Sequence, residues 1–212
     1  ATVAELLLDE AGFEAVCRQS ETGGYDLLPA NIELAGAEFQ LVSRIGRETR
    51  LKRLLAPVVA RYDFVLIDCP PALNTLTLNA LVAADDILIP VQCEYFALEG
   101  LSALLETVEQ VRSALHPELG IAGVLRTLYD ARNRLALDVS EQLMQYFGDK
   151  LFETLIPRNV RLAEAPSHGL AVIYYDKSSV GAKAYMQAAR ELIERARKRN
   201  RLGQATGKAA LS

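Results

Sequence analysis

The 212-residue sequence contains no apolar run long enough to cross a bilayer. Its two best candidates, residues 64–67 and 87–91, are far too short, and no charged-then-apolar leader precedes them. Hydrophobic residues make up 50% of the chain, which is enough for a full core at this length. We therefore expect a soluble, cytoplasmic protein with one α/β domain and no membrane span.

Cysteine is scarce, and its spacing argues against two kinds of site. Cys17, Cys69 and Cys93 are odd in number and form no C-x-x-C pair. This pattern supports neither a disulfide framework nor a zinc site. The three side chains are expected to be buried thiols.

The sequence also lacks a glycine-rich phosphate-binding loop that ends in lysine and a hydroxyl residue. The nearest match, G-Q-A-T-G-K-A from Gly203, has its glycines one residue too close together. Alanine replaces the Ser or Thr that would hold magnesium, and no strand precedes the segment. We reject it as a P-loop.

Charge is distributed unevenly along the chain. The formal net charge is -4, yet no acidic residue follows Glu194. The cations after that point are Arg195, Arg197, Lys198, Arg199, Arg201 and Lys208. An acidic body with a basic tail suggests an anionic partner, such as nucleic acid or an anionic membrane surface, and a solvated, frayed terminus is the alternative.

The stretch Y-D-F-V-L-I-D-C-P-P at residues 62–71 predicts a buried strand that ends in a carboxylate. Residues 64–67 are a short apolar run of strand formers, typical of a parallel strand covered on both faces. Asp68 follows, and Pro70 and Pro71 then turn the chain out of the sheet. Because ligands bind at the carboxyl ends of strands in open α/β sheets, Asp68 is a candidate site residue, and a turn or helix-cap aspartate is the alternative.

The remaining apolar pattern predicts strands that alternate with helices. Further strands are expected at residues 25–28, 87–91, 121–128 and 151–156, with an edge strand at 172–174. Helical patterns cover residues 2–10, 32–60, 73–83, 101–115, 135–147 and 180–199, and residues 157–170 are expected to form a polar loop. This alternation favours an α/β fold, a mostly parallel open sheet with helices on both faces.

Several segments of the chain share the pattern of one known family. They are D-L-L-P-A-N-I-E-L-A-G-A-E, Y-D-F-V-L-I-D-C-P-P, I-P-V-Q-C-E-Y-F-A-L-E-G-L, Y-D-A-R, F-G-D-K and I-P-R-N-V-R-L-A-E-A-P-S-H-G. In this order and spacing they closely resemble the ParA/Soj chromosome- and plasmid-partitioning ATPases, as far as about Arg195. The resemblance implies a deviant P-loop ATPase domain at residues 1–199 without its first strand and P-loop, and a basic, disordered tail at 200–212.

The resemblance also implies a nucleotide site for ATP and Mg²⁺. Asp68 matches a carboxylate that orients a magnesium-bound water, and Pro70 and Pro71 match a switch segment that senses the γ-phosphate. Three residues match those that read the adenine edge: Pro157, Arg158 and Asn159. For the last of these, the alternative is a loop in which Asn159 satisfies its own backbone.

Two further surfaces follow from the resemblance. The homodimer interface would include Glu94, Tyr95, Phe96 and Glu99, and ordinary packing is the alternative for these residues. Arg132 and Arg161 match arginines that bind DNA phosphates, and solvated surface arginines are the alternative. The cations that could widen this DNA-binding patch are Lys183, Arg195, Arg197 and Lys198.

Three functions are compatible with the sequence. The first is a ParA/Soj-type ATPase that segregates chromosomes or plasmids, dimerises with ATP, binds DNA without sequence preference, associates with the nucleoid and responds to a ParB-like protein. The second is a truncated or degenerate DNA- and partner-binding module without ATPase activity. The third is a MinD-like membrane-associated ATPase, although the basic stretch from Arg195 to Leu202 offers only Leu202 as a large apolar residue to insert.

The absent P-loop leads to two expectations. The 212 residues should not hydrolyse ATP by themselves, because nothing in them cradles the β- and γ-phosphates. The strands at 64–67 and 87–91 should flank the missing central strand, so each should present unpaired backbone groups or pair directly with the other.

Overall fold

The computed structural model describes residues 1–70, 72 and 74–209, with side chains as far as Arg199. The chain divides into two compact units. Unit 1 comprises Ala1–Asp85 and Thr107–Leu119, and unit 2 comprises Asp86–Glu106 and Gly120–Ser212. The single ATPase domain predicted at residues 1–199 stays a prediction.

Unit 1 is mainly helical. Its longer helices are α1 (Val3–Leu8), α3 (Glu33–Leu41), α4 (Arg50–Leu55) and α5 (Thr75–Ala83). They share a core of Ala4, Leu7, Leu8, Ala37, Leu41 and Leu51. Shorter elements are α2 (Phe13–Val16), the 3₁₀ turns η1 (Arg47–Thr49) and η2 (Val59–Arg61), and the antiparallel pair β1 (Arg18–Gln19) and β2 (Asp26–Leu27). The helical pattern predicted at 32–60 is therefore present, but in separate pieces.

Local polar contacts fix the helices of unit 1. The Thr2 side chain accepts a hydrogen bond from the Ala4 amide (3.2 Å), and Glu5 accepts one from the Thr2 amide (2.8 Å), which completes a capping box. The buried Asn79 of α5 accepts from the Leu51 amide (3.0 Å) and thereby joins α5 to the start of α4. These contacts satisfy amides that the first turns of α1 and α4 cannot pair internally.

The strand predicted at residues 64–67 is wrong. Residues 64–70 belong to no strand, and Phe64, Val65 and Leu66 are 46%, 42% and 79% exposed. A strand forms only where a neighbour pairs its backbone groups, and no strand in the described part of the chain pairs with this segment. It does not pair with residues 87–91 either. Only Ile67 packs against the core of unit 1.

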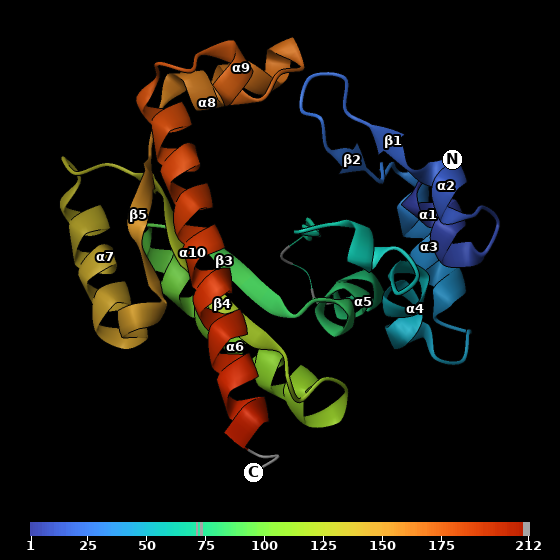
Figure 1. Ribbon diagram of the computed structural model, residues 1–212. Coiled ribbons are helices and arrows are strands. Elements are labelled where there is room, and N and C mark those ends of the chain that lie inside the picture. The colour runs from blue at the N-terminus through green and yellow to red at the C-terminus, as the bar shows by residue number, and fades with distance from the viewer. Residues whose placement is uncertain (71, 73, 210–212) are drawn as a thin grey trace. The chain divides into compact units, whose positions relative to one another are not determined.

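Unit 2 is built on a parallel sheet in the order β3–β4–β5 (Figure 1). The strands are β3 (Asp86–Gln92), β4 (Gly120–Tyr129) and β5 (Leu151–Pro157), which confirms the strands predicted at 87–91, 121–128 and 151–156. Helix α6 (Tyr95–Ala114) follows β3 and belongs to unit 2 as far as Glu106, and α7 (Arg134–Phe147) with the turn η3 (Gly148–Lys150) joins β4 to β5. Helix α10 (Val180–Ala209) is the last element.

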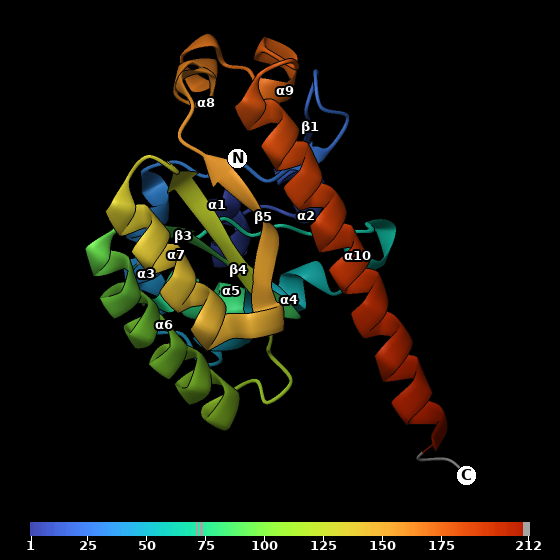
Figure 2. The ribbon, with the colours of Figure 1, turned by 90° about the vertical axis from the view of Figure 1, so that its left-hand side faces the viewer.

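Helices cover both faces of this sheet. Side chains alternate along a strand, so neighbouring residues face opposite sides. Val91 and Val124 pack with Leu143 of α7, whereas Leu125 and its cluster pack against α10 through Ala188. Figure 2 shows α7 and α10 on either side of the strands. The predicted fold class, an α/β fold with a parallel sheet and helices on both faces, is confirmed.

Two other segments differ from prediction. The loop expected at 157–170 contains α8 (Val160–Glu164) and the turn η4 (Ala165–His168), and the edge strand expected at 172–174 is the short helix α9 (Val172–Tyr175). Asn159 starts α8, because its Oδ1 accepts from the Arg161 amide (3.1 Å). Helix α10 runs to Ala209, where the sequence predicted a helix end at Arg199 and a disordered tail. Residues 210–212 lie outside the described residues.

The β4–β5 ladder contains two irregularities. Between the pairs Val124–Leu151 and Arg126–Leu155, β4 advances by two residues and β5 by four. Before the next pair, Tyr129–Pro157, β4 has one residue more than β5, and Leu128 of β4 takes a left-handed φ of 50°. Extra residues in a strand leave backbone groups without ladder partners, and those groups need partners elsewhere.

Arg126 supplies partners for the carbonyl groups of the β5 bulge. This β4 residue is 6% exposed, and its Nη2 donates to the carbonyls of Phe152 (2.9 Å) and Glu153 (3.3 Å). Its Nη1 donates to Oγ of Ser140 in α7 (2.8 Å), while Nε has no partner. A buried guanidinium without a carboxylate thus holds β4, β5 and α7 together.

Helix α10 supplies partners for the amide groups of the same bulge. The carboxylate of Glu191 accepts from the amides of Glu153 (3.0 Å) and Thr154 (2.9 Å). Arg195, one turn later, pairs with Glu191 (2.9 Å), donates to the Leu151 carbonyl (2.7 Å) and lies 4.4 Å above the Phe152 ring. These contacts fasten α10 to β5.

We expect Glu191→Gln to lower the free energy of unfolding by about 1–2 kcal/mol at pH 7, because a charged acceptor of backbone amides is lost. Burial alone would raise the pKa of Glu191, but hydrogen bonds from Thr154, Glu153 and Arg195 lower it. The contribution of the carboxylate is therefore full above its unfolded pKa, about 4.3, and declines as the pH falls below that value. Urea unfolding at pH 7, 5 and 3.5 measures it.

Glu194→Gln is the matched control, since Glu194 is an exposed neighbour in the same helix. It should change the unfolding free energy by less than about 0.5 kcal/mol. An equal loss in both variants, or a Glu191→Gln deficit that grows toward pH 3.5, would contradict the proposed bracing of the bulge.

Candidate functional site

The carboxyl ends of the three parallel strands bring polar loops to one edge of unit 2. Glu94 follows β3, Asp130 follows β4, and Arg158 follows β5. The Arg158 amide donates to the Tyr129 carbonyl (2.9 Å), and its guanidinium lies 3.6 Å from Glu94. We call the surface formed by these three neighbouring segments the carboxyl edge. It brings together Glu94, predicted for the interface, Arg132, predicted for DNA, and Arg158, predicted for adenine.

Arg132 lies on this edge in a bidentate ion pair. Its Nε and Nη2 donate to the two carboxylate oxygens of Asp130 at 2.9 and 2.8 Å, and its own amide donates to the same carboxylate at 3.0 Å. These hydrogen bonds, chiefly those from the Arg132 side chain and to a lesser extent the one from its amide, lower the pKa of Asp130 to about 2. The Arg132 side chain itself is 90% exposed. A phosphate could reach it, but Asp130 already occupies one edge of the guanidinium.

Arg161 is also paired. Its Nη1 donates to Glu164 of α8 (2.8 Å), and its Nε lies 3.5 Å from Asp176. The hydroxyl of Tyr175 donates to the same Glu164 oxygen (3.3 Å). The hydrogen bond to Glu164 is the main cause that raises the pKa of Arg161, so this arginine is charged at any working pH.

The three residues predicted to read adenine occupy the start of α8. Pro157 is half-buried and Arg158 is exposed. Asn159 caps α8 with its side-chain oxygen, which is the arrangement given above as the alternative. Its adenine-reading role stays a prediction, and the oxygen of its amide is already engaged.

Asp68 belongs to unit 1 and is exposed in an extended segment without strand pairing. Cys69 and Pro70 beside it are exposed too, so Cys69 is not the buried thiol that was predicted. Pro71 lies outside the described residues. Cys93 is buried as predicted, and Cys17 is half-buried.

The described residues do not fit an ATP–magnesium group by themselves. Among them, no three His, Cys, Asp or Glu side chains are grouped as metal ligands. Asp68 is therefore not part of a ready-made cluster of magnesium ligands. The lysine-bearing backbone cradle that phosphates require is absent from the 212 residues. The role of Asp68 therefore stays a prediction.

The predicted interface segment begins α6. Tyr95 and Phe96 are 69% and 77% exposed, and their rings meet edge-to-face at 5.5 Å. Glu94 and Glu99 are exposed as well. The alternative of ordinary core packing does not describe these aromatic rings, and their role in a dimer stays a prediction.

The cations of α10 fall into two groups. Lys183, Arg197 and Lys198 are exposed, as a DNA-binding role requires. Arg195 has only 22% of its side chain exposed, and its donors are taken by Glu191 and by backbone carbonyls. It serves the fold in this structure, and a DNA contact would require it to leave β5.

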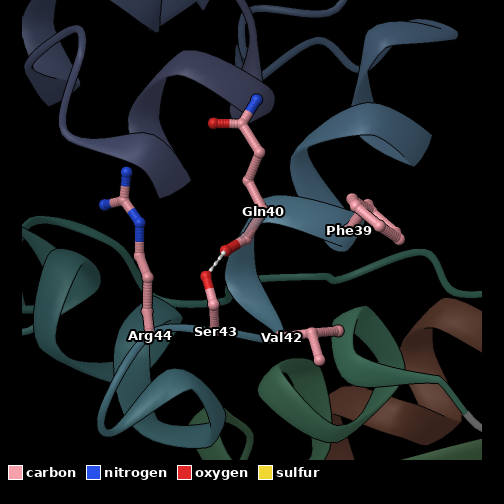
Figure 3. Close-up of a pocket in the computed structure, with 5 residues that line it drawn as sticks. All are labelled: Phe39, Gln40, Val42, Ser43 and Arg44. Atoms are coloured by element: carbon pink, nitrogen blue, oxygen red, sulfur yellow. Dashed lines mark hydrogen bonds between the residues drawn. The ribbon is translucent and has the colours of Figure 1, made fainter.

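A pocket of about 510 Å³ lies at the C-terminal end of α3 in unit 1 (Figure 3). Its lining residues are Phe39, Gln40, Val42, Ser43 and Arg44. Ser43 donates to the Gln40 carbonyl (3.0 Å), and Arg44 donates to the Leu8 carbonyl (3.1 Å). None of the predicted site residues lines this pocket.

Sequence reasoning missed the carboxylates of the carboxyl edge. Asp130, Glu164 and Asp176 all pair with the predicted DNA-binding arginines. The spacing of Asp130 and Glu164, two and three residues from their arginines, could have indicated two of these pairs. Asp176 could not be found in this way, because it is distant in sequence.

No helix in the described part of the chain combines the length and the apolar content needed to cross a bilayer.

The parallel sheet covered by helices on both faces is the α/β architecture of P-loop ATPases, and comparisons with known proteins agree. The family model described as "AAA domain" matches residues 1–121. The chain is 50% identical over 194 residues to the chromosome-partitioning ATPase Soj of Treponema pallidum, covering 92% of this chain and 77% of that protein. It is 51% identical over 190 residues to the sporulation initiation inhibitor protein Soj of Bacillus subtilis, covering 90% and 75%.

A solved structure shows the same likeness. Cobyrinic acid a,c-diamide synthase from Mycobacterium smegmatis, with bound ADP and magnesium, is 38% identical, has a TM-score of 0.74, and is covered over 69% of its chain by 88% of this one. The chain belongs to the ParA/Soj family of chromosome-partitioning ATPases.

We expect thiol labelling to follow the exposure of the three cysteines. Cys69 should react fastest with a maleimide and Cys93 slowest, with mass spectrometry locating the label. Partial desolvation of the sulfur and the negative charge of Asp68 raise the pKa of Cys69, so Asp68→Asn should increase its thiolate fraction and speed its labelling at pH 7.5. Asp138→Asn, an exposed aspartate in unit 2, is the control and should leave that rate unchanged. Protection of Cys69 would show that residues 64–70 are covered.

Proposed function

We propose that this protein acts in chromosome segregation by ATP-dependent dimerisation and non-specific DNA binding. The observation that carries the proposal is the 50% identity to a chromosome-partitioning ATPase across 92% of the chain. The arrangement of the carboxyl edge supports it, since exposed Arg132 in the loop after β4 and exposed Arg161 in the first turn of α8 stand where phosphates can approach. A role in plasmid segregation, a cytoplasmic, nucleoid-associated location and a ParB-like partner extend the same proposal.

For the nucleotide, we propose the assignments that the family resemblance implies. Asp68 would orient the water bound to Mg²⁺, Pro70 and Pro71 would sense the γ-phosphate, and residues 157–159 would lie beside adenine. The bound ADP and magnesium in the M. smegmatis relative support nucleotide binding. Because these 212 residues hold no lysine-bearing loop, we propose that hydrolysis needs such a loop in addition.

For DNA, Arg132 and Arg161 are the proposed centre of the contact. Exposed cations of α10 would widen it, namely Lys183, Arg197 and Lys198, with Arg195 contributing only if it leaves β5. The proposed dimer contact uses Glu94, Tyr95, Phe96 and Glu99, of which the two aromatic side chains offer the apolar area.

The second candidate is a DNA- and partner-binding module without ATPase activity. One observation favours it: no phosphate cradle exists among the 212 residues. It shares every DNA and partner surface with the first candidate and differs only in turnover.

We expect no detectable magnesium-dependent ATP hydrolysis from the purified 212-residue polypeptide, because Asp68 cannot replace the missing lysine and backbone cradle. A coupled assay of ADP release measures this, with Asp68→Ala as the matched variant. Equal, background rates in both agree with the expectation. Turnover that Asp68→Ala abolishes would show that the chain is an ATPase as it stands.

We expect Arg132→Ala and Arg161→Ala each to weaken binding to duplex DNA of arbitrary sequence by about 3–10-fold at low salt. Each lost phosphate contact should also reduce the slope of log K against log salt by about 1. Fluorescence anisotropy between 50 and 200 mM NaCl measures both quantities. Lys150→Ala, at the opposite edge of the sheet, is the control and should change the affinity by less than about twofold. Loss of affinity for one sequence alone would contradict the proposal.

A further inference from the structure

Each of three arginines on the carboxyl edge is paired with at least one carboxylate, although we propose that this surface binds a polyanion. Its cations are Arg132, Arg158 and Arg161, and the carboxylates paired with them are Asp130, Glu94, Glu164 and Asp176. A phosphate that approaches this surface meets each arginine together with an acidic partner. The carboxylates must therefore affect how strongly the edge binds DNA.

Asp130 occupies the part of Arg132 that a phosphate would use. A guanidinium offers two donors side by side for bidentate binding, and Asp130 takes Nε and Nη2 in this way. Asp130 is also held by the Arg132 amide, so it would stay in place if the arginine side chain swung toward DNA. Its pKa of about 2 means that protonation does not remove the competition at any physiological pH.

Glu164 and Asp176 likewise contact the donor groups of the Arg161 guanidinium. Glu164 takes Nη1, and Asp176 stands beside Nε at 3.5 Å. Asp176 is fixed by hydrogen bonds from the amide and hydroxyl of Ser178 (3.0 and 2.7 Å), whereas the Glu164 carboxylate accepts from Arg161 (2.8 Å) and from the Tyr175 hydroxyl (3.3 Å). Because Glu164 makes the shorter contact with Arg161, its removal would release the guanidinium most directly.

The cations of α10 provide an internal contrast. Within the described residues, Arg197 and Lys198 are exposed and have no carboxylate partner in this structure. Arg195 and Arg199 of the same helix do pair with carboxylates, Glu191 and Asp86, so carboxylate pairing is common on unit 2 but does not include every exposed cation.

We propose that Asp130 and Glu164 set the DNA affinity of this protein by competing with phosphate for Arg132 and Arg161. The inference rests on the DNA binding proposed above. Exposed ion pairs contribute little to stability, so DNA can displace the carboxylates. The displaced carboxylates nonetheless remain beside the phosphate and weaken the complex, which keeps binding reversible and strongly dependent on salt.

The test compares Asp130→Asn and Glu164→Gln with Glu141→Gln. All three remove one negative charge from unit 2, but Glu141 is exposed on α7 and has no arginine partner among the described residues. Binding of the full chain to a fluorescent duplex of arbitrary sequence is measured by anisotropy from 50 to 300 mM NaCl, with and without ATP and Mg²⁺. We expect about 3–10-fold tighter binding for Asp130→Asn and Glu164→Gln, and less than about twofold for Glu141→Gln.

A second pair of variants separates local competition from net charge. In an Arg132→Ala background, Asp130→Asn should gain no more affinity than Glu141→Gln does, because the arginine it competes for is gone. A full gain in that background would overturn the inference, as would weaker or unchanged binding by Asp130→Asn alone.

The outcomes also distinguish this inference from the function on which it rests. If the chain binds DNA but neither substitution changes its affinity, only the role of the carboxylates is wrong. If no variant binds DNA at 50 mM NaCl, with or without nucleotide, the proposed DNA binding itself is wrong. Urea unfolding of each variant confirms that a loss of binding does not reflect a loss of fold.

Discussion

The guanidinium of Arg126 stands where β4, β5 and α7 meet, and the arrangement of unit 2 depends on it. Strand β5 contains more residues than its neighbour between two paired positions, and Arg126 bonds the carbonyls left over. Buried charge is tolerated only where hydrogen bonds compensate its loss of hydration. Here two carbonyls and the Ser140 hydroxyl do so, with Nε left over. The bulge in turn sets where β5 ends, and hence where Arg158 and Arg161 stand.

Much of unit 2 could be predicted from the sequence, since β3, β4, β5 and α7 each bury a regular apolar pattern. Gly148 ends α7, and its φ of 52° is one that suits glycine. The bulge could not be predicted, because it changes pairing and not composition. In the sequence, Arg126 interrupts an apolar strand. Its neighbours in the sequence do not indicate that it will donate hydrogen bonds to the carbonyls of Phe152 and Glu153.

The segment at residues 64–67 shows the opposite limit. Its composition is that of a buried strand, and its exposure follows from the lack of a pairing neighbour among the described strands. Strand propensity describes how a side chain fits a sheet, so it does not create the sheet. The candidate site shows the same limit of sequence-based prediction. The family resemblance indicated Arg132 and Arg161, but only the structure showed which carboxylates pair with them.

The contacts of Glu191 and Arg195 have a consequence for assembly. Helix α10 lies along β5, and its Glu191 accepts hydrogen bonds from two backbone amides of that strand. Strand β5 is therefore poorly suited to pair with another strand. Strand β3 is different, since among the described strands it pairs with β4 alone and has a mainly apolar sequence. Among the described strands, β3 is therefore the edge strand whose backbone groups are best placed to pair with a further strand. Any strand that enlarges the sheet, from the same polypeptide or from another, would join beside β3 and so fix the order of the whole sheet.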